Sequence, residues 1–114
     1  MSNAQCLFCR IVAGEIPATK VAENADCLAF RDIGPQAPTH VLVIPKRHVG
    51  SLDALSDGAL GAALLAMARD VARAEGIAAD GYRVVTNTGA NGGQSVAHLH
   101  FHVLGGRKLT WPPG

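Results

Sequence analysis

A histidine stands at every second position of the segment His98–His102, and apolar residues fill the positions between and after them. Side chains alternate between the two faces of a β-strand, so the pattern predicts a strand, which we place at residues 97–104. The three imidazoles would share one face, each about 6.6–6.8 Å from the next. Leu99, Phe101 and Val103 would face the core. Imidazoles grouped in this way can act as nucleophile, proton carrier or metal ligand.

The rest of the chain predicts one long helix, one short N-terminal helix and four further strands. The long helix is expected at residues 57–75, with an apolar stripe at Leu60, Leu64, Met67 and Val71 that reads as core packing. A single long helix beside about five antiparallel strands predicts an α+β fold of two layers, formed by residues 1–114 as a single domain. The short helix is expected at residues 6–13, and the other strands at residues 19–23, 27–33, 39–45 and 81–88.

Composition narrows the classes of partner. The 114 residues carry ten basic and nine acidic side chains, and only 4% are aromatic. This balance argues against a nucleic-acid or membrane partner, since it offers neither a basic patch nor a base-stacking platform. No apolar stretch is long enough for a signal peptide or a membrane span, so a cytoplasmic location is expected. Three cysteines are poor material for a disulfide framework.

A glycine-rich loop precedes the histidine strand and ends in Gly92-Gly93-Gln94-Ser95. Glycines let backbone N–H groups approach an anion closely, and a serine adds a hydroxyl. A plain hairpin connection is the simpler interpretation of two glycines. The neighbouring histidines favour a phosphate-binding loop instead.

Three further features are open to more than one interpretation. Cys6 and Cys9 form a C-x-x-C that suits half of a Cys₂His₂ zinc site, a redox dithiol or two ordinary buried thiols. Asp32 could accept hydrogen bonds from the two hydroxyls of a ribose, or could cap a turn. His40 stands at the start of the strand at residues 39–45, and His48 follows its end. If that strand pairs with the last one, all five histidines would gather at one end of the sheet.

The segment from His98 to Leu104 fits the signature His-φ-His-φ-His-φ-φ, where φ is apolar, and on these residues the chain resembles the histidine-triad (HIT) family. Residues 32–40, 43–48, 92–96 and 105–107 look like the Hint branch of that family. The ending Trp111-Pro112-Pro113-Gly114 is specific to that branch. It separates the chain from the dinucleoside-polyphosphate hydrolase and galactose-1-phosphate uridylyltransferase relatives.

The resemblance implies a homodimer with a joint ten-stranded sheet, and hydrolysis of purine nucleoside phosphoramidates, such as AMP joined through nitrogen to an amine. His100 would be the nucleophile, with its second ring nitrogen donating to the carbonyl of His98. His102 would bind a phosphate oxygen, and Ser95 would lie beside the leaving group. No metal is required for this chemistry. The implied nucleotide contacts are Leu7, Phe8, Ile11, Phe30, Asp32, Ile33, Asn87, Gly93, Gln94, Ser95, Val96, His100, His102 and Trp111, the last reaching the partner's site.

The resemblance also implies structural zinc, because some bacterial Hint-like proteins bind it with such a C-x-x-C and two histidines. The matching ligands are Cys6, Cys9, His48 and His98. A nucleotide-binding, zinc-stabilised interaction module with vestigial catalysis and a dinucleoside polyphosphate hydrolase are the alternatives. Ala97 departs from the family pattern, which commonly has an aromatic residue before the first histidine.

Overall fold

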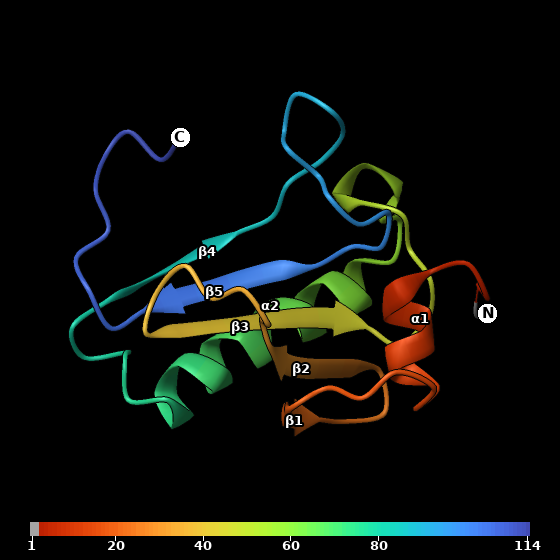
Figure 1. Cartoon of the computed structure of the whole chain (residues 1–114), viewed down its shortest axis with the longest axis horizontal. Coiled ribbons are helices and arrows are strands. Elements are labelled where there is room, and N and C mark those ends of the chain that lie inside the picture. The colour runs from red at the N-terminus through yellow and green to blue at the C-terminus, as the bar shows by residue number, and fades with distance from the viewer. Residues whose placement is uncertain (1–2) are drawn as a thin grey trace.

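The strands of residues 3–114 pair into one antiparallel sheet in the order β1-β2-β3-β5-β4 (Figure 1). The structure is a computed structural model and describes residues 3–114. No helix within this range is long and apolar enough to cross a membrane. The elements are α1 (Leu7–Val12), β1 (Lys20–Glu23), β2 (Cys27–Arg31), β3 (Thr39–Pro45), the 3₁₀ turn η1 (Leu52–Ala54), α2 (Gly58–Ala74), β4 (Tyr82–Val85) and β5 (Phe101–Gly105).

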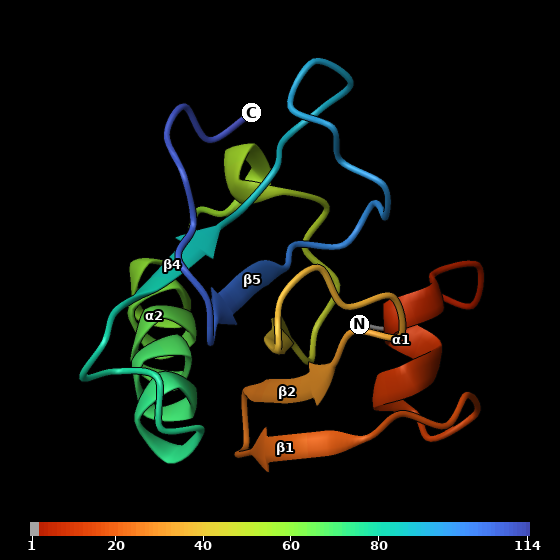
Figure 2. The same cartoon turned by 60° about the vertical axis from the view of Figure 1, so that its left-hand side comes forward.

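The two helices lie on opposite faces of the sheet (Figure 2). Alternate residues of β2 and β3 divide between them, as the two-residue period of a strand requires. One set packs with α2, and it includes Cys27, Ala29, Val41 and Val43. The other set packs with α1, and it includes Leu28, Phe30, Leu42 and Ile44. The sheet and α2 therefore form the expected α+β layers, and α1 covers part of the second face.

The long helix α2 begins and ends where the sequence predicts. The side chain of Asp57 accepts hydrogen bonds from the backbone N–H groups of Ala59 and Leu60, which caps the helix N-terminus. Gly76 follows the helix with a φ of +76°, a conformation that L side chains rarely adopt. The predicted apolar stripe is buried against the sheet.

The last strand is shorter than predicted, since β5 begins at Phe101 and not at residue 97. The residues before it bond to neighbours outside the sheet ladder: the N–H of Leu99 donates to the carbonyl of Val49 at 2.7 Å. The hydroxyl of Thr86 donates to the carbonyl of His100 at 2.8 Å, and β4 ends one residue earlier, at Val85. Side-chain alternation nevertheless continues through this segment, so the prediction that Leu99, Phe101 and Val103 face the core is confirmed, and they pack with α2.

Candidate functional site

A cavity of about 280 Å³ opens on the sheet face that carries α1. Its walls come from α1, the residues that follow it, the end of β2 and the residues just after it, β3, and β5 with the segment that leads into it. Most of the lining side chains are apolar, which suits a flat, uncharged ring such as a nucleobase. The lining residues are Leu7, Phe8, Ile11, Ile16, Pro17, Ala18, Phe30, Arg31, Asp32, Ile33, Leu42, Ser95, Val96, His100 and His102.

His100 presents one specific nitrogen to this cavity. Its Nδ1 lies 2.7 Å from the carbonyl oxygen of His98, and a carbonyl can only accept, so Nδ1 carries the proton. In a neutral ring Nε2 then holds a free electron pair. The ring of Phe8 packs edge-on against the His100 ring, with centroids 5.1 Å apart, and helps to fix its orientation. The predicted bond between His100 and the His98 carbonyl is therefore present.

A chain of hydrogen bonds sets the proton positions on two further histidines. The N–H of Gln36 donates to Nδ1 of His40 at 3.0 Å, so neutral His40 carries its proton on Nε2. That nitrogen lies 2.8 Å from Nδ1 of His102 and donates to it. Neutral His102 therefore carries its own proton on Nε2. It offers an N–H donor in the cavity wall, as a ligand for a phosphate oxygen should.

Burial keeps these two rings uncharged at neutral pH. Desolvation, together with the nearby His100 and His40 rings, lowers the pKa of His102 to about 4. Desolvation also lowers the pKa of His40, against the opposing effect of the Asp32 carboxylate. One oxygen of that carboxylate lies 3.5 Å from Nε2 of His40. Neutral rings with fixed protons are consistent with the direction of donation deduced from Gln36.

Asp32 follows β2 and lines the cavity. Its Oδ1 accepts a hydrogen bond from the N–H of Gly34 at 2.8 Å, so this residue does cap a turn. Its other oxygen, Oδ2, is directed toward His40, and a carboxylate oxygen has lone pairs for a further hydrogen bond. The two interpretations that the sequence left open for Asp32 are compatible.

The glycine-rich loop between β4 and β5 is held by Gln94. The side-chain amide donates to the carbonyls of Gly50 (2.7 Å) and Val96 (3.0 Å), and its oxygen accepts from the N–H of Gly89 (3.0 Å). The chain passes so close to itself that a Cβ on Gly92 would lie 2.3 Å from the carbonyl oxygen of Thr88. Gln94 thus fixes the loop that carries Ser95, which lines the cavity.

Four of the predicted nucleotide contacts do not line the cavity within this chain: Asn87, Gly93, Gln94 and Trp111. Trp111 is 82% exposed, so its side chain packs little against its own chain. In the other direction, the sequence interpretation missed several wall residues. Ile16, Pro17, Ala18, Arg31 and Leu42 carry no motif, and only the fold brings them to the cavity.

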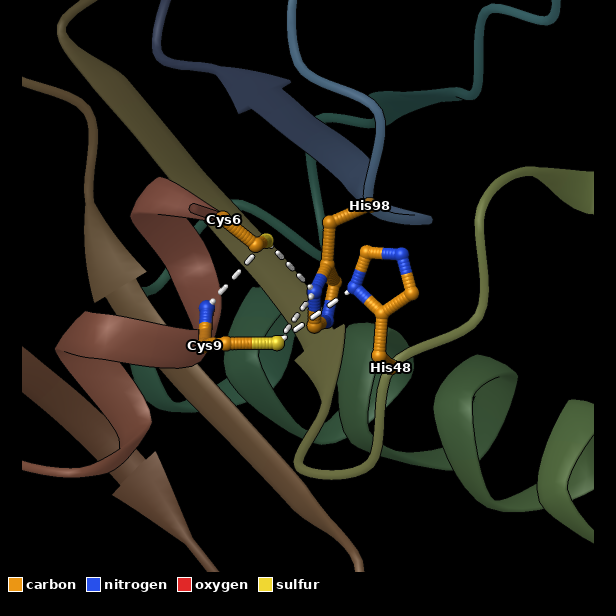
Figure 3. A group of neighbouring side chains, drawn as sticks. All are labelled: Cys6, Cys9, His48 and His98. Atoms are coloured by element: carbon orange, nitrogen blue, oxygen red, sulfur yellow. Dashed lines mark hydrogen bonds between the residues drawn. The ribbon is translucent and has the colours of Figure 1, made fainter. Parts of the chain in front are cut away.

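A second group of side chains lies beside the cavity and consists of Cys6, Cys9, His48 and His98 (Figure 3). Cys6 caps the N-terminus of α1, which places Cys9 one turn further along the same helix. Nδ1 of His98 lies 3.3 Å from Sγ of Cys6 and 3.6 Å from Sγ of Cys9. Nδ1 of His48 lies 3.4 Å from Sγ of Cys9.

This group fits tetrahedral zinc. With Zn–S of about 2.3 Å and Zn–N of about 2.0 Å, neighbouring sulfur and nitrogen ligands of a tetrahedron are about 3.5 Å apart, close to the separations found here. All four ligand atoms lie within 4.8 Å of one another. The other nitrogen of His98, Nε2, is 2.9 Å from the carbonyl oxygen of Pro45, an outer contact typical of metal-binding histidines. Burial raises the pKa of the Cys9 thiol, which a bound cation would offset.

The five histidines do not gather at one end of the sheet, and that expectation is wrong. β3 does pair with β5, but His40 is the second residue of β3 whereas His48 follows its end. The rings therefore form two groups. His48 joins His98 in the Cys/His cluster, and His40 joins His100 and His102 at the cavity.

Fold and site together define a small α+β protein with a histidine-lined cavity and an adjacent Cys₂His₂ cluster. Residues 13–109 match the family model of the HIT domain. An uncharacterized HIT-like protein of Synechococcus elongatus is 52% identical over 110 residues, covering 95% of this chain and 96% of that protein. The chain belongs to the HIT domain family.

Two further relatives bear on the site. A 14 kDa zinc-binding protein of Zea mays is 46% identical over 126 residues, covering 100% of this chain and 91% of that protein. The crystal structure of a HIT family hydrolase from Legionella pneumophila superposes with a TM-score of 0.94 at 54% identity. That alignment covers 96% of this chain and 100% of the other.

Proposed function

We propose that this protein is a hydrolase of the Hint type that cleaves the P–N bond of purine nucleoside phosphoramidates. The observation that carries the proposal is the bond between Nδ1 of His100 and the carbonyl of His98. In a neutral ring it leaves Nε2 of His100 unprotonated, as a nucleophile must be, at the wall of a cavity that suits a nucleotide. The name of the Legionella pneumophila structure, a HIT family hydrolase, supports the same class of activity.

The reaction would proceed in two displacements. Nε2 of His100 forms a bond to the α-phosphorus, the P–N bond breaks, and the amine leaves with the electron pair and takes a proton from solvent, relayed through the Ser95 hydroxyl. Water then attacks the phosphorus of the nucleotidyl-histidine, the P–Nε2 bond breaks with its electron pair returning to Nε2, and the proton lost by that water returns to solvent. The products are the free amine and the nucleoside monophosphate. Dividing one difficult step into two in this way is the usual advantage of a covalent intermediate.

Residues around His100 would supply the electrostatic part of catalysis. The Nε2–H of His102 would donate to a non-bridging phosphate oxygen, where negative charge is held in the transition state. Because His40 fixes that proton in advance, no reorganisation is needed when the substrate arrives. Asp32 would hold the ribose, and the apolar wall around Phe8, Phe30 and Ile33 would hold the purine.

A second copy of this chain is the partner that we propose. β4 is an edge strand, so one side of its backbone is unpaired. Val84 pairs with Val103 and hence lies on the face that α2 covers, yet it is 38% exposed. Tyr82 on the same strand and Leu65 on α2 are exposed as well. A homodimer joined at β4 would bury these side chains, extend the sheet to ten strands and let Trp111 reach the partner's cavity.

We propose that the Cys/His cluster holds zinc in a structural role. The name of the Zea mays relative supports the metal. A closed set of four protein ligands is typical of structural zinc, whereas catalytic zinc keeps an open position. Such a metal would fix α1 to the segment that begins with His98, and it would supply no step of the reaction.

The proposal is tested with adenosine 5′-phosphoramidate as substrate. Wild-type protein should release AMP, and a rapidly quenched reaction should show a nucleotidyl group on the peptide that contains His100. His100→Asn should lose turnover by more than about 10³-fold while still binding AMP with an unchanged circular dichroism spectrum. AMP binding without turnover by wild type would instead assign a nucleotide-binding module. Preferential cleavage of a dinucleoside polyphosphate in direct competition would assign the other hydrolase class.

A further inference from the structure

The short helix α1 forms one wall of the nucleotide cavity, yet few directional contacts join it to the rest of the protein. The lining residues on α1 are Leu7, Phe8 and Ile11. Within residues 3–114, the hydrogen bonds and ion pairs of residues 3–16 stay inside that segment, except for those of the Cys6 and Cys9 thiols (Figure 3). In the described part of the chain, the Cys/His cluster is therefore the sole polar attachment of α1.

Apolar packing also holds α1, but part of its buried face borders the cavity. Phe8 and Ile11 pack with apolar side chains of β2 and β3, and the ring of Phe8 lies edge-on to that of Phe30 with centroids 5.5 Å apart. Where the same side chains line the cavity they have no protein atoms opposite them, so dispersion contacts are fewer there. A helix of six residues is not stable by itself in water. The docked position of α1 therefore depends on what fills the cavity and on what the cluster holds.

We infer that the Cys/His cluster and the nucleotide cavity are coupled through α1, so that zinc at the cluster raises the affinity of the cavity for a nucleotide. The inference rests on the proposed function, which supplies both ligands. Bonds from two thiolates and two imidazoles to one ion would hold α1 firmly, whereas thiol S–H groups are only weak hydrogen-bond donors. A nucleotide in the cavity favours the same docked position, because it contacts the apolar side chains of α1. Two ligands that stabilise one conformation bind with positive cooperativity.

The opposite wall of the cavity is held independently of the cluster. His98 is fully buried, and its Nε2 lies 2.9 Å from the carbonyl oxygen of Pro45. The N–H of the next residue, Leu99, donates to the carbonyl of Val49 at 2.7 Å. These contacts fix the segment that carries His100 in both states of the cluster. The element that can move is therefore α1, and its lining side chains carry the coupling.

The experiment measures the affinity for AMP by calorimetry in zinc-loaded wild type and in wild type depleted of zinc with a chelator that is then removed. The zinc-loaded protein should bind AMP about fivefold or more tightly, as is usual for coupling between two sites. Competition with a chromophoric chelator gives the affinity for zinc. Saturating AMP should raise that affinity by the same factor, because coupling between two ligands is reciprocal. Equal AMP affinities in the two forms would overturn the inference.

Hydrogen exchange separates the release of α1 from general unfolding. In zinc-depleted protein the amides of residues 10–13 should exchange almost as fast as in an unstructured peptide, whereas those at the centre of α2 should remain protected. Adding AMP should restore protection to residues 10–13. Strong protection of residues 10–13 in zinc-depleted protein before AMP is added would show that α1 stays docked without the metal. Loss of protection throughout α2 would show general unfolding, and either result would overturn the inference.

Two substitutions on α1 test the route of the coupling. Phe8→Ala removes a side chain that lines the cavity, so the ratio of AMP affinities between the zinc-loaded and zinc-depleted forms should fall toward one. Val12→Ala is the matched control, because Val12 packs against the same apolar cluster but does not line the cavity, and it should keep the wild-type ratio. An unchanged ratio in Phe8→Ala would overturn the route through α1.

The outcome is separable from that of the proposed hydrolysis, because none of these measurements needs turnover. AMP binding that depends on zinc, in a protein that cleaves no phosphoramidate, would contradict the hydrolase and support the coupling. Turnover of the phosphoramidate with AMP affinity independent of zinc would do the reverse. Wild type that binds no zinc, or no AMP, would overturn the coupling together with the corresponding part of the proposed function.

Discussion

Nε2 of His40 donates a hydrogen bond to Nδ1 of His102 across 2.8 Å, although the two residues are 62 positions apart in the chain. The direction of donation follows from the backbone N–H of Gln36, which occupies the other nitrogen of His40. His40 has no place in the cavity wall. It acts on the site through His102, and is therefore a positioning residue.

Replacing His40 by leucine should lower kcat by about tenfold to a hundredfold, with a smaller change in KM. This is less than the 10²–10³-fold cost of deleting a transition-state donor outright, because His102 is still present but free to exchange its two neutral tautomers. His40→Gln keeps an N–H donor and should restore much of the lost rate. Steady-state kinetics on adenosine 5′-phosphoramidate measure both variants. Equal losses in the two would show that the position matters for packing alone.

The depressed pKa of His102 predicts how stability depends on pH. The native ring takes up a proton near pH 4, whereas an unfolded histidine does so near pH 6.5. Between these values the unfolded state binds more protons than the native state, so the free energy of unfolding falls as the pH falls from about 6.5 toward 4. Well above pH 6.5, His102 is neutral in both states and does not contribute to the pH dependence of the free energy of unfolding.

His102→Gln removes this titration and serves as the comparison. Urea unfolding midpoints at pH 7.5 and 5.0 should decrease more in wild type than in His102→Gln, since all other titrating groups are common to both. A decrease of the same size in both proteins would contradict a depressed pKa at His102.

Much of the fold could be predicted because its signals are local. The stripe of α2, the cap at Asp57 and the glycine after the helix are all encoded within a few residues of one another. The alternation of histidines with apolar residues likewise identifies the faces of the last strand. Its first residue could not be predicted, because it depends on distant partners: the carbonyl of Val49 and the hydroxyl of Thr86 replace strand pairing before Phe101.

The residues of the candidate site likewise divide into those that the sequence predicts and those that only the fold brings together. The motif around His100 and the ligand types of the Cys/His cluster could be taken from the sequence and from its resemblance to the HIT family. The role of His40 could not, because its partner His102 is reached only when β3 pairs with β5. Wall residues such as Leu42 are ordinary apolar strand residues, and nothing in their local sequence distinguishes a cavity wall from a core.

Cys9→Ser should remove bound metal and lower stability. Protein purified without added zinc should contain about one zinc per chain by elemental analysis, and the variant should contain almost none. The melting temperature should fall by about 5 °C or more, because metal bound to the native state contributes to folding free energy. Dialysis of wild type against a chelator should reproduce the decrease.

Cys27→Ala is the control for zinc content, since Cys27 is buried but lies outside the cluster. Wild type free of zinc, with all its thiols reduced, would refute the site.

Val84→Lys should convert a dimer into a folded monomer. Val84 lies on the edge strand β4 and is 38% exposed, so a lysine there costs the single chain little. In a dimer joined at β4 the same lysine would be buried beside apolar groups without a partner charge, which strongly disfavours association. Sedimentation velocity should therefore give wild type twice the chain mass of 11.8 kDa and the variant the mass of one chain.

The control is Ala13→Lys, at an exposed position that follows α1, and this variant should stay dimeric. A dimeric Val84→Lys protein would place the interface elsewhere, and a monomeric wild type would refute the proposed homodimer.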